Sequence, residues 1–228
     1  MHTFSTLSLP FIFLDRLLYD TNGLQTEEEL SNAKQKAQSL FELCEKFVQS
    51  LGLTILIERP VNIYTEEKLH RSTSGATFNK LRIPSCTIEL GPMKVALPTC
   101  RDAGIKAVLN GLIFSQNVVD VAPSVITEEP VLRFENYHRY LVYPQANATG
   151  ICDFQLVPGS PFKIGDVLVI IRAMDGQVVD KVIAEFDGYC ITWVDRVTTY
   201  AGQSLGMVAV DDQNSPTIIS WQELTTKK

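Results

Sequence analysis

The stretch that decides the fold is residues 84–91, which read Pro-Ser-Cys-Thr-Ile-Glu-Leu-Gly. An extended strand places alternate side chains on opposite faces, so Cys86 and Ile88 share one face while Thr87 and Glu89 share the other. A Gly-Pro pair then ends the strand. A buried carboxylate costs free energy unless it reaches water or is used, and α/β proteins keep their sites at such sheet margins. Glu89 is therefore a candidate functional residue.

An amphipathic helix is predicted upstream of this strand. Thr26 and Glu29 have capping-box spacing, apolar residues recur with helical period as far as Leu51, and Gly52 provides the stop. Residues 53–57 follow as a short continuous apolar run, which is typical of a strand buried on both faces by helices. This alternation of helix and strand predicts an α/β fold for the first part of the chain.

A second helix is predicted downstream, over residues 102–114. Ile105, Val108, Leu109 and Leu112 recur at helical spacing and share one face. We expect this face to pack against the core.

The character of the sequence changes past Phe114. Pro123 and Pro130 bracket a stretch without helical period, so we predict an α/β domain over residues 1–125 and a small β domain over residues 131–212. Few contacts are expected to cross this linker, so the two domains should be separable. Residues 213–228 are expected to form a polar, frayed tail.

The second domain is predicted to be antiparallel. Its short β-branched runs are separated by turn dipeptides at intervals of roughly ten residues, as in a small barrel or sandwich. These dipeptides are Pro158-Gly159, Gly165-Asp166, Asp175-Gly176, Asp187-Gly188 and Ala201-Gly202.

Composition excludes several classes of function. With 45% hydrophobic and 20% charged residues the chain is an ordinary globular protein, and its net charge of −6 argues against a nucleic-acid partner. The longest apolar runs fall far short of the ~20 residues of a membrane span, and no signal peptide is evident, so we expect a cytoplasmic protein. The five cysteines form no CxxC pair and are expected to be buried free thiols.

The motif Thr-Ile-Glu-Leu-Gly at residues 87–91, followed by a helix with Leu-Asn-Gly-Leu at 109–112, resembles the succinylglutamate desuccinylase/aspartoacylase family of carboxypeptidase-like zinc hydrolases. The resemblance implies the C-terminal part of a zinc-carboxypeptidase-like mixed sheet with helices, followed by a small all-β barrel-like domain. It also implies a zinc cofactor, a small N-acyl amino acid substrate and Glu89 as general base on a zinc-bound water.

The same resemblance implies a metal ligand at the start of the chain. The family binds zinc through an HxxE pair and a later histidine in a D-L-H-T-like segment, and His2 fits that later ligand. A histidine beside the initiator is otherwise an ordinary terminal residue. None of His2, His70 and His138 begins an HxxE motif, so the first two ligands are absent. The chain resembles the family only from its third ligand onward, which implies a missing N-terminal half or a homo-oligomer as partner.

Other polar residues have two interpretations each. Arg71 lies in the segment before the Glu89 strand, where its guanidinium could bind a substrate carboxylate, or it is simply a solvated loop residue. His138 is interpreted as part of a packed surface rather than as a ligand.

A non-catalytic remnant or interaction module is the alternative function. Residues 150–211 resemble the barrel attached to this family, which looks like the biotinyl/lipoyl carrier fold. A carrier needs a lysine at its hairpin tip, but residues 173–177 contain none, and Lys181 lies in the next strand. The sequence therefore argues against a carrier role.

Overall fold

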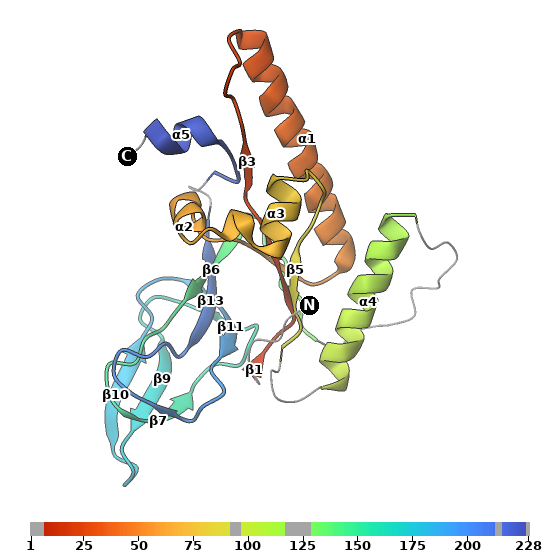
Figure 1. Ribbon diagram of the computed structural model, residues 1–228. Helices are drawn as coiled ribbons and strands as arrows, with labels where there is room; N and C mark the ends of the chain where they lie inside the picture. The colour runs from red at the N-terminus through yellow and green to blue at the C-terminus, as the bar shows by residue number, and fades with distance from the viewer. Residues whose placement is uncertain (1–6, 92–96, 117–128, 213–215, 227–228) are drawn as a thin grey trace.

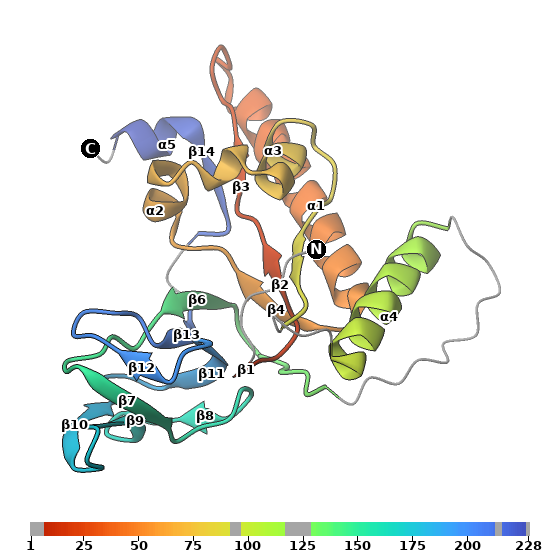
Figure 2. The same cartoon turned by 60° about the horizontal axis from the view of Figure 1, so that its bottom comes forward.

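The computed structural model describes residues 7–91, 97–116, 129–212 and 216–226, and Figures 1 and 2 show it in two views. The helices are α1 (Glu27–Leu51), α2 (Val61–Glu66), α3 (Thr73–Asn79), α4 (Pro98–Phe114) and α5 (Trp221–Thr226), with a 3₁₀ turn η1 (Leu69–Arg71). The strands are β1 (Leu7–Ser8), β2 (Phe11–Leu14), β3 (Leu17–Tyr19), β4 (Thr54–Ile57), β5 (Thr87–Glu89), β6 (His138–Val142), β7 (Gly150–Phe154), β8 (Pro161–Phe162), β9 (Val167–Arg172), β10 (Val178–Ile183), β11 (Gly188–Trp193), β12 (Thr198–Thr199), β13 (Gly206–Asp211) and β14 (Ile218–Ser220).

The main sheet is mixed and runs through both predicted domains. Within the described residues its order is β1-β11-β13-β6-β4-β2-β5, with β8 also paired to β11. Strands β2, β4 and β6 are parallel, whereas β5 is antiparallel to β2. The seam between the two halves is a single register pair, Ile57 with Arg139. The α/β prediction is thus confirmed as a mixed sheet with helices.

Helix α1 begins and ends where the sequence predicts. Thr26 and Glu29 form the capping box, and Gly52 ends the helix with a left-handed φ of 80°. This conformation is easily adopted only without a Cβ, which explains the glycine. The buried face of the helix starts only at Ala37, and Leu30 is exposed, so its first turns project beyond the core.

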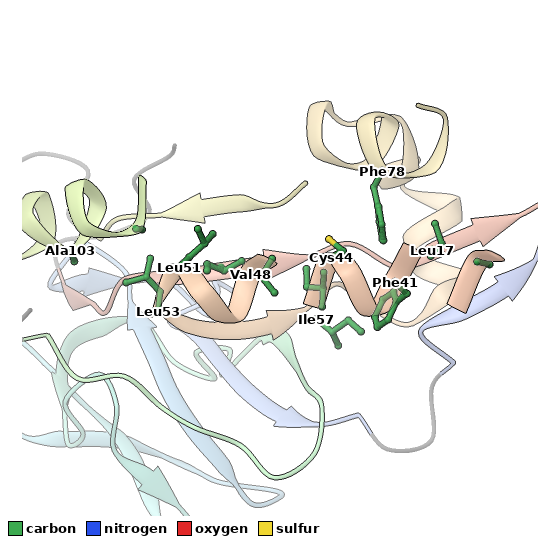
Figure 3. Close-up of a cluster of buried hydrophobic side chains, with 13 residues drawn as sticks. Leu17, Phe41, Cys44, Val48, Leu51, Leu53, Ile57, Phe78 and Ala103 are labelled. Carbon is green, nitrogen blue, oxygen red and sulfur yellow. The ribbon is translucent and has the colours of Figure 1, made fainter. Parts of the chain in front are cut away.

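The core between α1 and the sheet is apolar. Phe41, Cys44, Val48 and Leu51 lie along one side of α1 and pack with residues of β2, β4, α3 and α4 (Figure 3). Burial of an apolar side chain of this size stabilises the fold by about 1.5–3 kcal/mol. The run at residues 53–57 is buried on both faces of the sheet, as predicted, with only Ile55 partly exposed. All five cysteines are free thiols, as predicted, but only four of them are buried, since Cys86 is partly exposed.

The strands of residues 131–212 pair antiparallel with one another, as predicted, but the barrel is not confirmed. Strands β10-β9-β7-β12 form a separate sheet, while β6, β11 and β13 belong to the main sheet. The two sheets share an apolar cluster that includes Leu168, Val169, Cys190 and Trp193. The described strands do not close into a barrel, because the inner face of the second sheet is covered by the main sheet instead.

Contacts between the two halves are extensive, contrary to expectation. One apolar cluster joins Phe11 and Leu56 of the first half to Tyr140, Ile191 and Met207 of the second. The division at residues 125–131 stays a prediction about independent folding, which limited proteolysis tests.

A buried ion pair also joins the halves. Arg16, directly after β2, donates through Nη2 to Asp212 Oδ2 at 2.7 Å, and both side chains are almost fully buried. Arg16 also donates to the carbonyl oxygens of Arg59 and Pro216. Asp212 is within 3.3 Å of Arg139 as well.

The expectation of a frayed tail is wrong for residues 216–226. Strand β14 pairs in parallel with β3, and α5 follows it (Figure 1). Ile219 packs in a buried cluster with Leu18 and Tyr64. The apolar pair Ile218-Ile219 was the sequence signal for this strand.

Helix α4 starts earlier than predicted and presents a different face to the core. Its buried residues are the small ones, Cys100, Ala103, Gly104 and Ala107. Ile105, Val108 and Leu112 are 37–48% exposed, so the prediction that their face packs against the core is wrong. Small residues allow a closer approach to α1 and to Leu90 than branched side chains would.

No helix in the described ranges combines the length and apolarity that crossing a lipid bilayer requires.

We predict that Asp212→Asn lowers the free energy of unfolding by about 3–5 kcal/mol, because it leaves the Arg16 charge buried without its counter-ion. Urea denaturation measures this loss. The matched control is Asp187→Asn, which breaks the exposed ion pair with Lys163 and should leave the midpoint almost unchanged. Equal, small effects of the two variants would contradict a dependence of the fold on the buried pair.

Candidate functional site

Glu89 lies at the end of β5, opposite Phe11 at the start of β2. Its exposed fraction is 6%, so the carboxylate is buried rather than directed to water. The predicted alternation holds, because Cys86 and Ile88 pack against the core beneath α1 and Leu90 contacts α4 at Gly104. β5 therefore holds Glu89 on the sheet face away from α1.

The backbone that follows Glu89 is tightly enclosed. Gly91 has a left-handed φ of 95°, and a Cβ there would lie 3.1 Å from the carbonyl oxygen of Ser8 and from Cys100 Sγ. The glycine of the T-x-E-L-G motif is thus required by both its conformation and its close packing. It brings the Glu89 strand against Ser8 near the start of the chain and against the first turn of α4.

The described residues do not by themselves fit a zinc ion. No group of three or more His, Cys, Asp or Glu side chains converges among residues 7–91, 97–116, 129–212 and 216–226. His2, the predicted ligand, lies outside the described residues.

Arg71 is placed on η1 with an exposed side chain. The preceding residue, His70, packs its ring against Trp221 of α5, with ring centroids 5.1 Å apart. Arg71 therefore lies beside the C-terminal helix. Glu89 is at the level of Phe11, where β2 begins. The substrate-binding role of Arg71 stays a prediction.

The packed surface expected around His138 is observed. Its ring stacks on Phe134 with a centroid distance of 4.0 Å and meets Tyr189 edge-on. The histidine is part of a packed aromatic surface.

Sequence reasoning missed a second polar cluster, at the opposite end of β2. The parallel strands β2 and β4 each end in an acid–arginine pair, Asp15-Arg16 and Glu58-Arg59. The recurrence of this dipeptide directly after two apolar runs was a usable signal. The carboxyl ends of adjacent parallel strands meet at one sheet edge, so the four side chains gather there.

The carboxyl groups of this cluster are perturbed by burial. Asp15 is 1% exposed and accepts a 2.7 Å hydrogen bond from the Tyr64 hydroxyl. Burial raises the pKa of Asp15, with the hydrogen bonds from Tyr64 and Ser74 opposing the rise. Burial, reinforced by the charge of Asp15, raises the pKa of Glu58 to about 7. Arg59 donates to the Tyr140 hydroxyl at 2.8 Å, which closes the cluster on the side of β6.

A groove of about 780 Å³ lies between α1 and residues 132–138. Leu14, Ile55 and Ile57 line it, as do polar side chains such as Glu45 and Tyr137. Neither Glu89 nor Arg71 is among its lining residues, so the groove is separate from the predicted catalytic position.

Solved structures with the same arrangement are desuccinylase and aspartoacylase proteins. A succinylglutamate desuccinylase from Silicibacter sp. TM1040 is 13% identical, with a TM-score of 0.59 over 90% of this chain and 54% of that one. The chain has the desuccinylase/aspartoacylase fold. A succinylglutamate desuccinylase/aspartoacylase from Rhodobacter sphaeroides gives 13% identity and a TM-score of 0.60 over 91% of this chain and 55% of that one.

A third structure with the desuccinylase/aspartoacylase fold is the product-bound ectoine utilization protein EutE (DoeB) from Ruegeria pomeroyi. It is 14% identical, with a TM-score of 0.62 over 92% of this chain and 56% of that one. No family model and no curated protein matches the sequence. The chain thus spans little more than half the length of these structures, and identities of 13–14% establish the shared fold alone.

We predict that Glu58→Gln changes how stability depends on pH. The pKa of Glu58 is near 4.5 when unfolded and about 7 when folded, so the folded chain holds this proton longer as pH rises. Stability should therefore fall between pH 4.5 and 7, by roughly 1–3 kcal/mol, and then level off. Urea denaturation at several pH values should show that this fall is reduced in Glu58→Gln and retained in the exposed control Glu66→Gln. If the stability of the parent chain rises from pH 5 to 7 and the two variants do not differ, the half-buried Glu58 does not hold its proton in the folded chain.

Proposed function

We propose that this chain supplies the general base of an amide hydrolase that acts on a small N-acyl amino acid. One observation carries the proposal. A buried carboxylate, Glu89, closes a T-x-E-L-G strand in a chain that shares its fold with proteins named desuccinylases and aspartoacylases. The resemblance of that motif assigns Glu89 the role of base.

Glu89 would act on both halves of the reaction. Its carboxylate accepts a proton from the water that attacks the amide carbonyl, and then gives this proton to the nitrogen of the leaving amino acid. Burial on β5 holds the carboxylate in one place and excludes bulk water. Both effects favour proton transfer at a fixed position over exchange with solvent.

The proposed cofactor is zinc, with His2 as one ligand. Zinc, when bound, supplies Lewis-acid polarisation of the water and of the carbonyl. A catalytic zinc needs three protein ligands, and the described residues do not form such a set. The other ligands would therefore come from polypeptide equivalent to the part of the neighbouring structures that this chain does not match.

Arg71 is the proposed contact for the substrate carboxylate. Its guanidinium is exposed and can make a bidentate contact with a carboxylate. Its place beside α5 would require the substrate, or the loop that carries Arg71, to bridge the distance to β5.

A non-catalytic remnant or interaction module is the second candidate. It is favoured by the match to only 54–56% of the neighbouring chains. The cheapest discriminating observation is an upstream coding sequence with an in-frame HxxE motif, which the enzyme requires and the remnant does not.

We predict that the purified chain retains well under one zinc per chain after dialysis, because only one of the three expected ligands is present in the sequence. Elemental analysis measures the ratio. Stoichiometric zinc would show that the ligand set has been placed wrongly.

We predict that Glu89→Gln abolishes most activity once the HxxE-bearing part is supplied. The amide keeps the size of the side chain but cannot accept the proton, and general-base assistance is worth about 10²–10⁴ in rate. Hydrolysis of N-succinylglutamate and zinc content are the measurements. Zinc should remain in Glu89→Gln, whereas His2→Ala should lose zinc and activity together.

Glu66→Gln is the matched control, since Glu66 is an exposed acid on α2. Near-normal turnover by Glu89→Gln would remove the proposed role of Glu89, whatever the substrate.

A further inference from the structure

Helix α4 has two apolar faces, of which one is already packed. On the packed face Gly104 lies against Leu90, where a Cβ would come within 2.6 Å of Leu90 Cδ1. Further along the same face, a Cβ on Gly111 would lie 3.1 Å from Leu51. This face therefore packs against α1 and the end of β5, and its first buried residue, Cys100, also contacts Glu129.

The second face carries an exposed apolar stripe, formed by Leu97, Ile105, Val108 and Leu112, with the exposed Arg101 among them at the same helical spacing. These residues follow helical spacing on one flank of α4 and are 37–48% exposed. A helix that is apolar on more than one side is normally buried on more than one side. The stripe therefore has the composition of an interface rather than of a solvated surface.

Strand β5 lies at one end of the sheet as the structure describes it. It pairs with β2 on one side, and the described strands place no partner on its other side. Leu81 and Ile83, just before β5, are 60% and 52% exposed. An open strand edge flanked by exposed apolar residues is a template for a further strand.

Helix α4 and strand β5 lie on one side of the molecule. In both views α4 and β5 lie on the side away from β7, β9 and β10 (Figures 1 and 2). Leu90 connects them, because it follows β5 and packs against α4 at Gly104. A single partner could therefore cover both.

We propose that the β5 edge and the α4 stripe form one docking surface for the polypeptide that supplies the remainder of the desuccinylase/aspartoacylase fold. In the neighbouring structures, 44–46% of each chain has no counterpart in this protein. A segment of that size must pack against the matched part. The partner adds a strand to β5 and covers the α4 stripe. This inference rests on the proposed function, since the same partner would bring the missing ligands toward Glu89.

The first experiment uses the chain alone. The double variant Ile105→Lys/Leu112→Lys should leave the melting temperature within about 2 °C of the parent, because these two side chains are 48% and 37% exposed among the described residues. Gly104→Val should lower it clearly, since the new side chain collides with Leu90. A loss of stability in the double variant as large as that in Gly104→Val would overturn the proposal.

The second experiment supplies a partner. The part of Ruegeria pomeroyi EutE without a counterpart here is fused to the full chain through a flexible linker, which gives an effective concentration of about millimolar. Hydrogen exchange of the β5 and α4 amides should slow by about tenfold or more in the fusion. In a fusion that carries Ile105→Lys/Leu112→Lys, the stripe variant, these amides should exchange as fast as they do in the chain alone. The matched control Val157→Lys/Ile164→Lys, which changes exposed apolar residues of the second half, should not.

The outcomes separate the docking surface from the proposed function. If the β5 and α4 amides are protected but the fusion hydrolyses no substrate, the docking surface is supported and the proposed hydrolase function is contradicted. Unchanged exchange in a folded fusion overturns the surface, as does a dimer of the chain alone that the stripe variant dissociates, because the occupant is then a second copy.

Discussion

The fold depends on the buried ion pair between Arg16 and Asp212. Four separate segments meet at the Arg16 guanidinium, namely the end of β2, the carbonyl after β4, the end of β13 and the segment that leads into β14. A charge with no exposure to water is tolerated only when its donors are satisfied and its charge is compensated. The requirement to satisfy Arg16 therefore fixes how the second half of the chain sits against the first.

The two ends of β2 have different chemistry. At its start, opposite Phe11, a single buried carboxylate lies on the neighbouring strand. At its other end, acid–arginine pairs from β2 and β4 form a network that reaches Tyr64 and Tyr140. The network joins the halves of the fold, and within it the second carboxylate oxygen of Asp15 is buried without a hydrogen-bond partner among the described residues. At the start of β2 the sheet holds Glu89 on β5, the strand that ends the main sheet as far as the described residues show it.

Local features could be predicted from the sequence where one interaction decides the structure. The capping box at Thr26, the stop at Gly52 and the face of Glu89 all follow from local spacing and are observed. The buried face of α4 could not be predicted in this way. Periodicity favours the large residues Ile105 and Leu112, but the close approach of Leu90 and α1 selects the small ones.

The pairing of β14 with β3 and the partners of Arg16 also depend on contacts between residues far apart in sequence, which no local pattern encodes. The roles of Glu89 and His2 were predicted from the resemblance of short motifs to a family. The structure does not test the role of His2, because this residue lies outside the described residues.

The separation of Arg16 from Asp212 has a consequence for biosynthesis. The two residues are 196 positions apart, so at ~5–20 residues per second the counter-ion is translated about 10–40 s after the arginine. During that interval β2, α1 and β4 leave the ribosome with a guanidinium that has no counter-ion in the nascent chain at its native place. The first half can collapse around its apolar core, but its arginine must stay hydrated until the C-terminal strands arrive. Arrival of the C-terminal strands, rather than completion of the first half, is thus the step that forms the native arrangement around Arg16.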